Sequence, residues 1–219
     1  MARFKDRREA GRQLAAALAG FRASEPVILA LPRGGVPVAF EVAEALDAPL
    51  DIALVRKIGA PQHEEFGIGA VAEGLEPVIM LDDDLIRTVQ PPPGYVEKET
   101  ARQLAEMARR RERYAGARPI VPVEGRTVIL IDDGVATGGT ARAALRAMRQ
   151  RGAARVVLAV PVAAPDSLDR LRAEADEVVC LLAPERMNAV GNYYADFNPT
   201  PDEEVVDLLE RAAAGRTRP

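Results

Sequence analysis

Residues 128–140 read VILIDDGVATGGT. The four apolar residues predict a strand that is buried on both faces, as strands of parallel sheets are. Asp132 and Asp133 follow where that strand ends, and the loop 136–140 then opens a predicted helix. Its two glycines let a phosphate approach the backbone, while amides, threonine hydroxyls and a helix N-terminus can hold a dianion. Because ligands of parallel sheets bind beyond the carboxyl ends of the strands, this stretch predicts a site for a phosphorylated sugar, whose vicinal hydroxyls would donate to the two carboxylates.

Short apolar runs alternate with helical patterns along the rest of the chain. The runs predict strands at residues 27–31, 52–55, 128–131, 156–160 and 178–182. Helices are predicted near the N-terminus and at residues 36–46, 97–114, 140–151, 167–175 and 202–213. Asp82–Asp84 is interpreted as the N-cap of a further helix. The alternation predicts an α/β fold: a single domain over residues 1–219, with a mostly parallel sheet of about five strands that helices cover on both faces.

Two segments break this alternation. Residues 59–74 are rich in glycine and polar residues, which predicts a long loop that runs into a hairpin with residues 78–81. Residues 184–201 are irregular and contain Tyr193, Tyr194 and Phe197. Both segments are long enough to be functional loops.

The composition argues against several classes of function. Lysine and arginine number 29 against 33 aspartates and glutamates, and the net charge of −4 argues against a dedicated binder of duplex nucleic acid. One cysteine and one histidine remove most zinc sites, which take three or four such ligands. Signal-peptide and membrane-span patterns are absent from the sequence, so we expect a cytoplasmic protein.

The 128–140 stretch resembles the phosphoribosyl diphosphate (PRPP) motif of type I phosphoribosyltransferases. It is most similar to the adenine branch of that family. The resemblance implies that Asp132 and Asp133 hold the ribose hydroxyls. It also implies that the 5′-phosphate is bound by the loop that contains Ala136, Thr137, Gly138, Gly139 and Thr140. The implied cofactor is Mg²⁺, which the substrate oxygens and water would coordinate rather than a protein ligand set.

Two further segments resemble the parts of this family that bind diphosphate. Leu31-Pro32-Arg33-Gly34-Gly35 follows the first predicted strand and is similar to the family's diphosphate loop, which implies a cis peptide between Pro32 and Arg33. Arg56 and Lys57 end the second predicted strand and resemble a pair that reaches the diphosphate. The alternatives are an ordinary strand-to-helix turn at residues 31–35 and a solvated strand end at residues 56–57.

The acid/base and the base-binding residues follow only from the resemblance. A flexible loop over residues 59–74 would close on the substrate, and Glu73 after it would exchange a proton with the base; the alternative is a solvated hairpin glutamate. Residues 183–201, with the N-terminal region, would form a hood over the base, beside a core of residues 22–182. Met187 and Asp196 are its candidate base contacts, and the alternative is a packed aromatic subdomain. Ala136 stands where the hypoxanthine–guanine branch has an aspartate, which argues against a 6-oxopurine acceptor.

The implied activity is transfer of ribose 5-phosphate from PRPP to a nitrogenous base, with release of diphosphate. The alternative is a protein of the same fold that senses PRPP or a nucleotide without catalysis. The expected partners are therefore PRPP and a base or nucleotide. Neither a membrane nor nucleic acid is expected, and a homodimer is left open.

Overall fold

The computed structural model describes residues 4–74, 76–116 and 118–215. Its central element is a five-stranded sheet in the order β2-β1-β6-β7-β8, and all four strand pairs are parallel. The strands are β1 (Val27–Ala30), β2 (Leu50–Ile52), β6 (Thr127–Ile131), β7 (Arg155–Val162) and β8 (Glu177–Leu182). The predicted α/β fold with a parallel sheet of five strands is confirmed.

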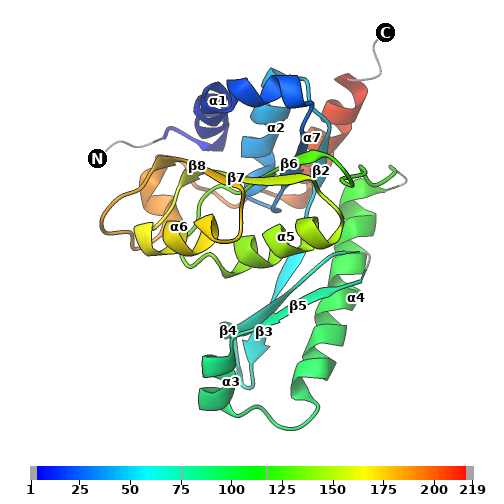
Figure 1. Cartoon of the computed structure of the whole chain (residues 1–219), viewed down its shortest axis with the longest axis vertical. Helices are drawn as coiled ribbons and strands as arrows, with labels where there is room; N and C mark the ends of the chain where they lie inside the picture. Colours follow the sequence, from blue (N-terminus) through cyan, green and yellow to red (C-terminus); the bar gives the residue numbers. More distant parts are fainter. Residues whose placement is uncertain (1–3, 75, 117, 216–219) are drawn as a thin grey trace.

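Helices cover both faces of this sheet (Figure 1). One face carries α1 (Arg7–Ala17), α2 (Gly35–Leu46) and α7 (Asp202–Gly215), and the other carries α5 (Gly139–Gln150) and α6 (Pro165–Arg172). Alternate side chains of β6 enter the two layers, because Ile129 and Ile131 pack with α2 and α7 while Val128 and Leu130 pack with α5. This double burial explains why the strands read as continuous apolar runs.

A second unit, which we call the arm (residues 55–115), extends from the α5 side of the sheet (Figure 1). It contains an antiparallel sheet of β3 (Val55–Ala60), β4 (His63–Ala72) and β5 (Val78–Leu81), followed by α3 (Asp83–Val89) and α4 (Tyr95–Ala115). The Asp82 carboxylate caps α3 by accepting from the backbone N–H groups of Asp84 and Leu85, as the sequence predicted.

The prediction of a long loop over residues 59–74 was wrong. Most of this stretch is strand, in a hairpin of β3 and β4 whose tight turn contains Gln62 in the left-handed region (φ +63°). Glycine is needed within β4 for close packing against β5, because a Cβ on Gly69 would lie 2.5 Å from the carbonyl oxygen of Met80. The glycine content that suggests a loop thus reflects tight contact between strands.

Replacement of Gly69 by alanine is expected to lower the free energy of unfolding by roughly 1–3 kcal/mol, since the β5 backbone must move away from the added methyl group. Gly20→Ala is the matched control, because its Cβ would meet no atom within 4 Å. Urea denaturation of both variants measures the difference, and equal stabilities would contradict the packing explanation.

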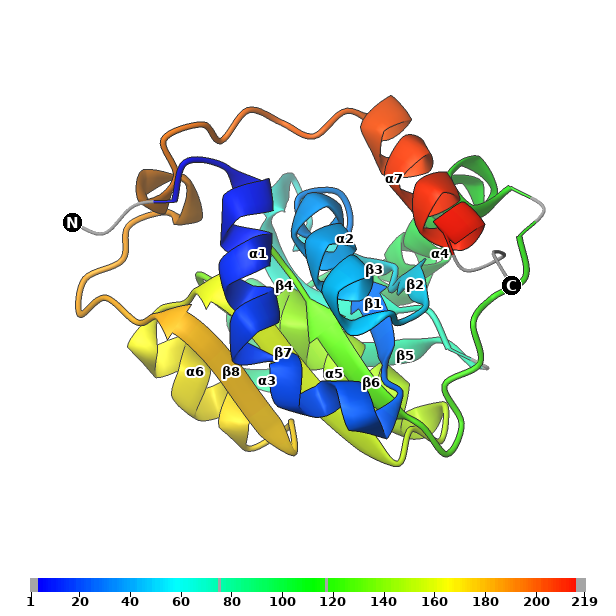
Figure 2. The ribbon, with the colours of Figure 1, turned by 90° about the horizontal axis from the view of Figure 1, so that it is seen from above.

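The N-terminal segment and residues 190–198 lie side by side, as Figure 2 shows for the dark blue start of the ribbon and the orange-brown segment before α7. Phe4 forms a parallel bridge with Tyr194, just after the short helix η2 (Val190–Tyr193), and a second short helix, η1 (Ala19–Ser24), follows α1. The rings of Phe4 and Tyr194 are 5.4 Å apart between centroids. None of the helices in the described part of the chain is long and apolar enough to span a membrane.

Candidate functional site

The 136–140 loop after β6 contacts α6 on one side and is exposed to solvent on the other. The Ser167 hydroxyl at the start of α6 donates to the carbonyl oxygen of Ala136 at 2.6 Å. Gly138 is the N-cap of α5 and adopts φ +82°, a conformation that glycine takes without steric cost. Gly138 is buried, whereas Ala136, Thr137, Gly139 and Thr140 are exposed. The loop therefore presents its free face to solvent at the N-terminus of α5.

The loop 32–35 meets the two aspartates at the carboxyl ends of β1 and β6. These strands are neighbours, and the Leu31 N–H donates to the carbonyl oxygen of Ile131 at 2.8 Å. A Cβ on Gly34 would lie 2.0 Å from Oδ2 of Asp133, so any side chain there would displace the carboxylate. The peptide between Pro32 and Arg33 is cis, as the resemblance implied. The structure thus brings together two loops that lie almost 100 residues apart in the chain.

Burial of the two neighbouring aspartates raises the pKa of both carboxyl groups. Burial and the neighbouring Asp133 charge raise the pKa of Asp132. Burial also raises the pKa of Asp133, while Arg7 opposes that rise. Nε of Arg7 donates to Oδ2 of Asp133 at 2.8 Å. Arg7 is not among the predicted site residues, because it precedes the motif by more than 120 residues and has no local pattern that points to the site.

Arg33, within the 32–35 loop, lies next to the start of α7. Nη1 of Arg33 is 3.6 Å from Oδ1 of Asp202, the first residue of α7. The Tyr114 hydroxyl donates to the same oxygen at 2.6 Å, and burial together with this carboxylate raises the pKa of Tyr114 to about 12. Arg33 remains 44% exposed, so a ligand at the 32–35 loop can reach it.

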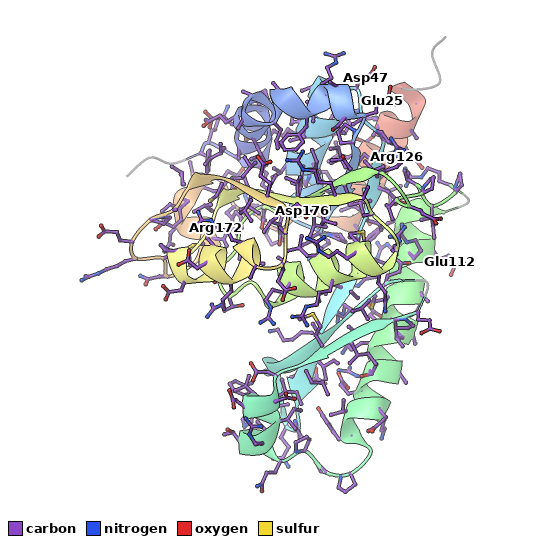
Figure 3. All side chains as sticks on the ribbon, viewed as in Figure 1. Glu25, Asp47, Glu112, Arg126, Arg172 and Asp176 are labelled. Atoms are coloured by element: carbon purple, nitrogen blue, oxygen red, sulfur yellow. The ribbon has the colours of Figure 1, made fainter. Side chains whose placement is uncertain are left out.

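A cavity of about 800 Å³ separates the 136–140 loop from the arm. Thr137, Gly139 and Thr140 line one wall, and Lys57 with the apolar side chains of Phe66 and Met80 lines another. Charged groups complete the lining: Asp82, Asp83, Asp84, Arg87, Arg142 and Arg170. Figure 3 shows side chains from α5 and from the arm occupying the region between them, with Glu112 on the part of α4 nearest the sheet.

Arg56 and Lys57 point to opposite faces of β3, as neighbouring strand residues do. Lys57 lines the cavity, whereas Arg56 packs against α4, where its Nε donates to Oε1 of Gln103 at 2.8 Å. Burial lowers the pKa of the Arg56 guanidinium. The structure therefore places only Lys57 of this predicted pair beside the 136–140 loop.

Glu73 and the two candidate base contacts lie outside the residues that line the cavity, as do the two aspartates and the 32–35 loop. Glu73 accepts from Nε of Arg111 at 3.1 Å and from Nη2 at 2.5 Å. Met187 packs beside the cluster of Phe4, Tyr193 and Tyr194. The Asp196 carboxylate accepts from the backbone and side-chain amides of Asn198, at 3.1 and 2.8 Å.

The sequence matches the family described as "Phosphoribosyl transferase domain" over residues 3–196. This chain belongs to the phosphoribosyl transferase family. The predicted resemblance to type I phosphoribosyltransferases is thereby confirmed at the level of the family. The match includes both loops and both aspartates of the site.

Individual relatives of this family member agree with the assignment. A Mycobacterium tuberculosis H37Rv protein, which carries the provisional name of a phosphoribosyl transferase, is 47% identical over 209 residues, 95% of this chain. This chain spans about half the length of that relative (47%). An adenine phosphoribosyltransferase of Chelativorans sp. is 48% identical over 54 residues, 25% of this chain and 30% of the relative.

A crystal structure of a similar protein has the same fold over nearly its whole length. The protein TT1426 from Thermus thermophilus superposes with a TM-score of 0.81 and 50% sequence identity, covering 95% of this chain and 98% of the other. The transferase fold described above is thus present in an experimental structure of a relative.

Proposed function

We propose that this phosphoribosyl transferase moves ribose 5-phosphate from PRPP to a nitrogenous base and releases diphosphate. The supporting observation is the meeting of the 32–35 loop with the carboxylates of Asp132 and Asp133, beside an exposed glycine-threonine loop at the N-terminus of α5. In that arrangement the two carboxylates would accept from two hydroxyls. The 136–140 loop on one side and the 32–35 loop on the other would each take a phosphoryl group. A pentose carrying phosphate at one end and diphosphate at the other fits this order of groups.

In the proposed reaction, the bond between C1 of the ribose and the diphosphate oxygen breaks, and its electron pair leaves with diphosphate. A bond forms between C1 and a nitrogen of the base, which then loses its proton. The transition state would carry oxocarbenium character, as in glycoside hydrolysis. Cations that neutralise the departing diphosphate would lower the barrier. Arg33, in the 32–35 loop, is the candidate that the geometry supports, and Lys57, which lines the cavity with Thr137 and Thr140, is a candidate from the resemblance.

The site fits Mg²⁺ as a companion of the substrate. Asp132 and Asp133 would hold the ribose hydroxyls, whose oxygens are among the hard donors that Mg²⁺ prefers. Within the described residues, no group of three or more His, Cys, Asp or Glu side chains is placed to hold a metal ion. Mg²⁺ would therefore be coordinated by the ribose hydroxyls that Asp132 and Asp133 hold, by diphosphate oxygens and by water, and the ion would supply charge neutralisation on the leaving group.

Lys57 and Arg56 provide a test of the diphosphate assignment. Lys57→Met is expected to weaken PRPP binding about tenfold, because a charge-assisted contact is lost. Arg56→Met is expected to have a smaller effect, since its guanidinium contacts Gln103 on the opposite face of β3. Calorimetric titration with PRPP and MgCl₂ compares the two, and the reverse order would contradict the proposed position of the diphosphate.

A second candidate function is sensing of PRPP or a nucleotide without turnover. The observation that favours it is the Glu73 carboxylate, both oxygens of which accept hydrogen bonds from Arg111. In that case the candidate acid/base would be structural. Met187 and Asp196 stay the candidate contacts of the acceptor, and a homodimer stays open.

One assay separates the two functions. The protein is incubated with PRPP, MgCl₂ and a panel of purine, pyrimidine and other nitrogenous bases, and diphosphate and nucleotide products are quantified. A nucleotide formed from one of these bases supports the transferase. PRPP binding without turnover of any base favours the sensor, and absence of both binding and turnover contradicts the proposal.

A further inference from the structure

Arg7 is anchored at the site by three segments of the chain. It is the first residue of α1, and its side chain is only 11% exposed. Nε donates to Oδ2 of Asp133 at 2.8 Å, and Nη1 donates to the carbonyl oxygen of Asn198 at 2.7 Å. The guanidinium lies 3.9 Å from the centroid of the Phe197 ring. These contacts hold the guanidinium in one orientation, because its planar fork is engaged on two edges and one face.

This guanidinium lies where the two loops of the site meet. A Cβ on Gly34 would be 3.3 Å from Nε of Arg7 and 2.0 Å from Oδ2 of Asp133. Arg7 thus contacts the carboxylate from the side of the 32–35 loop, although it belongs to neither loop. If Arg7 served only to link α1 with the C-terminal segment, its guanidinium would not need to contact the Asp133 carboxylate.

Two adjacent half-buried carboxylates cannot both be charged without compensation. The groups facing Asp133 are Asp132 from its own loop, Arg7 from α1 and Tyr194, whose hydroxyl donates to the Asp133 carbonyl oxygen at 2.6 Å. Arg33 in the 32–35 loop is paired with Asp202 instead. Among the described residues, Arg7 is therefore the cation that contacts the aspartate pair.

We propose that Arg7 is a positioning residue of the donor site, which holds the Asp133 carboxylate in the orientation that accepts a ribose hydroxyl of PRPP. The inference rests on the proposed function. An ionised carboxylate has about four lone-pair sites, so Asp133 can accept from Arg7 and from a hydroxyl at the same time. Arg7 thereby acts through Asp133 and needs no contact with the substrate.

The test compares Arg7→Gln, Arg7→Lys and the control Arg8→Gln by calorimetric titration with PRPP and MgCl₂ between pH 5.5 and 9. Arg8 is next on the same helix, but it faces Glu204 at 3.3 Å and Glu41 at 3.6 Å. We expect Arg7→Gln to bind PRPP about tenfold more weakly at pH 7, as loss of one charged hydrogen bond implies. Arg7→Lys should recover part of the affinity, and Arg8→Gln should stay within about twofold of the unmodified protein.

The pH dependence separates positioning from a merely structural role. Without the guanidinium, the pKa of Asp133 rises further, so its ionised form is lost at higher pH. The acid-side midpoint of PRPP binding should therefore move to higher pH in Arg7→Gln and less in Arg7→Lys. An unchanged midpoint, with affinity reduced equally at every pH, would overturn the inference.

A measurement without ligand distinguishes failure of the inference from failure of the proposed function. The unfolding free energies of Arg7→Gln, Asp133→Asn and the double variant are compared. Positioning predicts that the double variant loses less stability than the sum of the single variants, and additive losses would overturn it. Coupling between the two residues in a protein that binds no PRPP would instead overturn the proposed function, and the assignment to a donor site with it.

Discussion

Replacement of Gly139 by valine is expected to abolish PRPP binding while leaving the protein folded. Gly139 is exposed at the start of α5 and lines the cavity. A Cβ there would meet no atom within 4 Å, so the added side chain points into open space where the 5′-phosphate would lie. Loss of two charge-assisted contacts to the phosphate would weaken binding at least about 100-fold. Calorimetric titration with PRPP and MgCl₂ measures this, with thermal denaturation as the test of folding.

Gly138 is a poorer target for the same experiment. Its φ of +82° disfavours any side chain, and its Cβ would already lie 3.4 Å from Cδ1 of Leu171. Gly20→Val is the matched control, since its Cβ also meets no atom within 4 Å and it lies in η1. A Gly139→Val protein that binds PRPP as tightly as Gly20→Val would refute the phosphate assignment.

The second large effect concerns stability. Arg111→Met is expected to lower the free energy of unfolding by about 3–5 kcal/mol, the usual loss when one partner of a buried ion pair is removed. Arg111 is 13% exposed and contacts Oδ1 of Asp51 at 2.7 Å, Oε2 of Glu73 at 2.5 Å and the carbonyl oxygen of Ile52 at 2.8 Å. Through these contacts α4 of the arm is tied to β2 of the main sheet and to the end of β4. The variant leaves the Asp51 carboxylate, which is 10% exposed, without its cation.

Urea denaturation measures this effect, and Arg109→Met provides the control. Arg109 lies on the same helix and pairs with Glu106 at 2.6 Å, but its side chain is 73% exposed. Its removal should cost less than about 1 kcal/mol, as for other surface ion pairs. Equal losses in the two variants would show that the Arg111 cluster does not hold the arm to the sheet.

Burial on both faces made the main sheet predictable. Four of the five predicted apolar runs correspond to β1, β6, β7 and β8. The remaining run, 52–55, spans the end of β2 and the first residue of β3, because the chain passes there from the main sheet to the arm. Continuous apolar sequence shows that a segment is buried, but it does not show where one strand stops and the next begins.

The β3–β4 hairpin was missed for a different reason, whereas the predicted pairing of residues 78–81 with the preceding segment is present as β4 and β5. Gly67 and Gly69 were interpreted as loop residues, whereas the structure places both in β4. Local sequence cannot separate a glycine that bends the chain from one that admits a neighbouring strand. The separation of Arg56 from Lys57, in contrast, could have been anticipated, since strand alternation by itself sends the two side chains to opposite faces.

The sequence by itself determined the alternation of strands and helices in the main sheet and the resemblance to the family. It also pointed to Asp132, Asp133 and the 136–140 loop as a candidate phosphate-sugar site. These features depend on neighbours in the chain, through apolar periodicity, turn-forming glycines and helix caps. Only the tertiary structure brought Gly34 and Arg7 to Asp133, turned Arg56 away from the cavity and engaged Glu73 with Arg111. These contacts join residues that are distant in the sequence, and they form because packing of strands and helices brings those residues together.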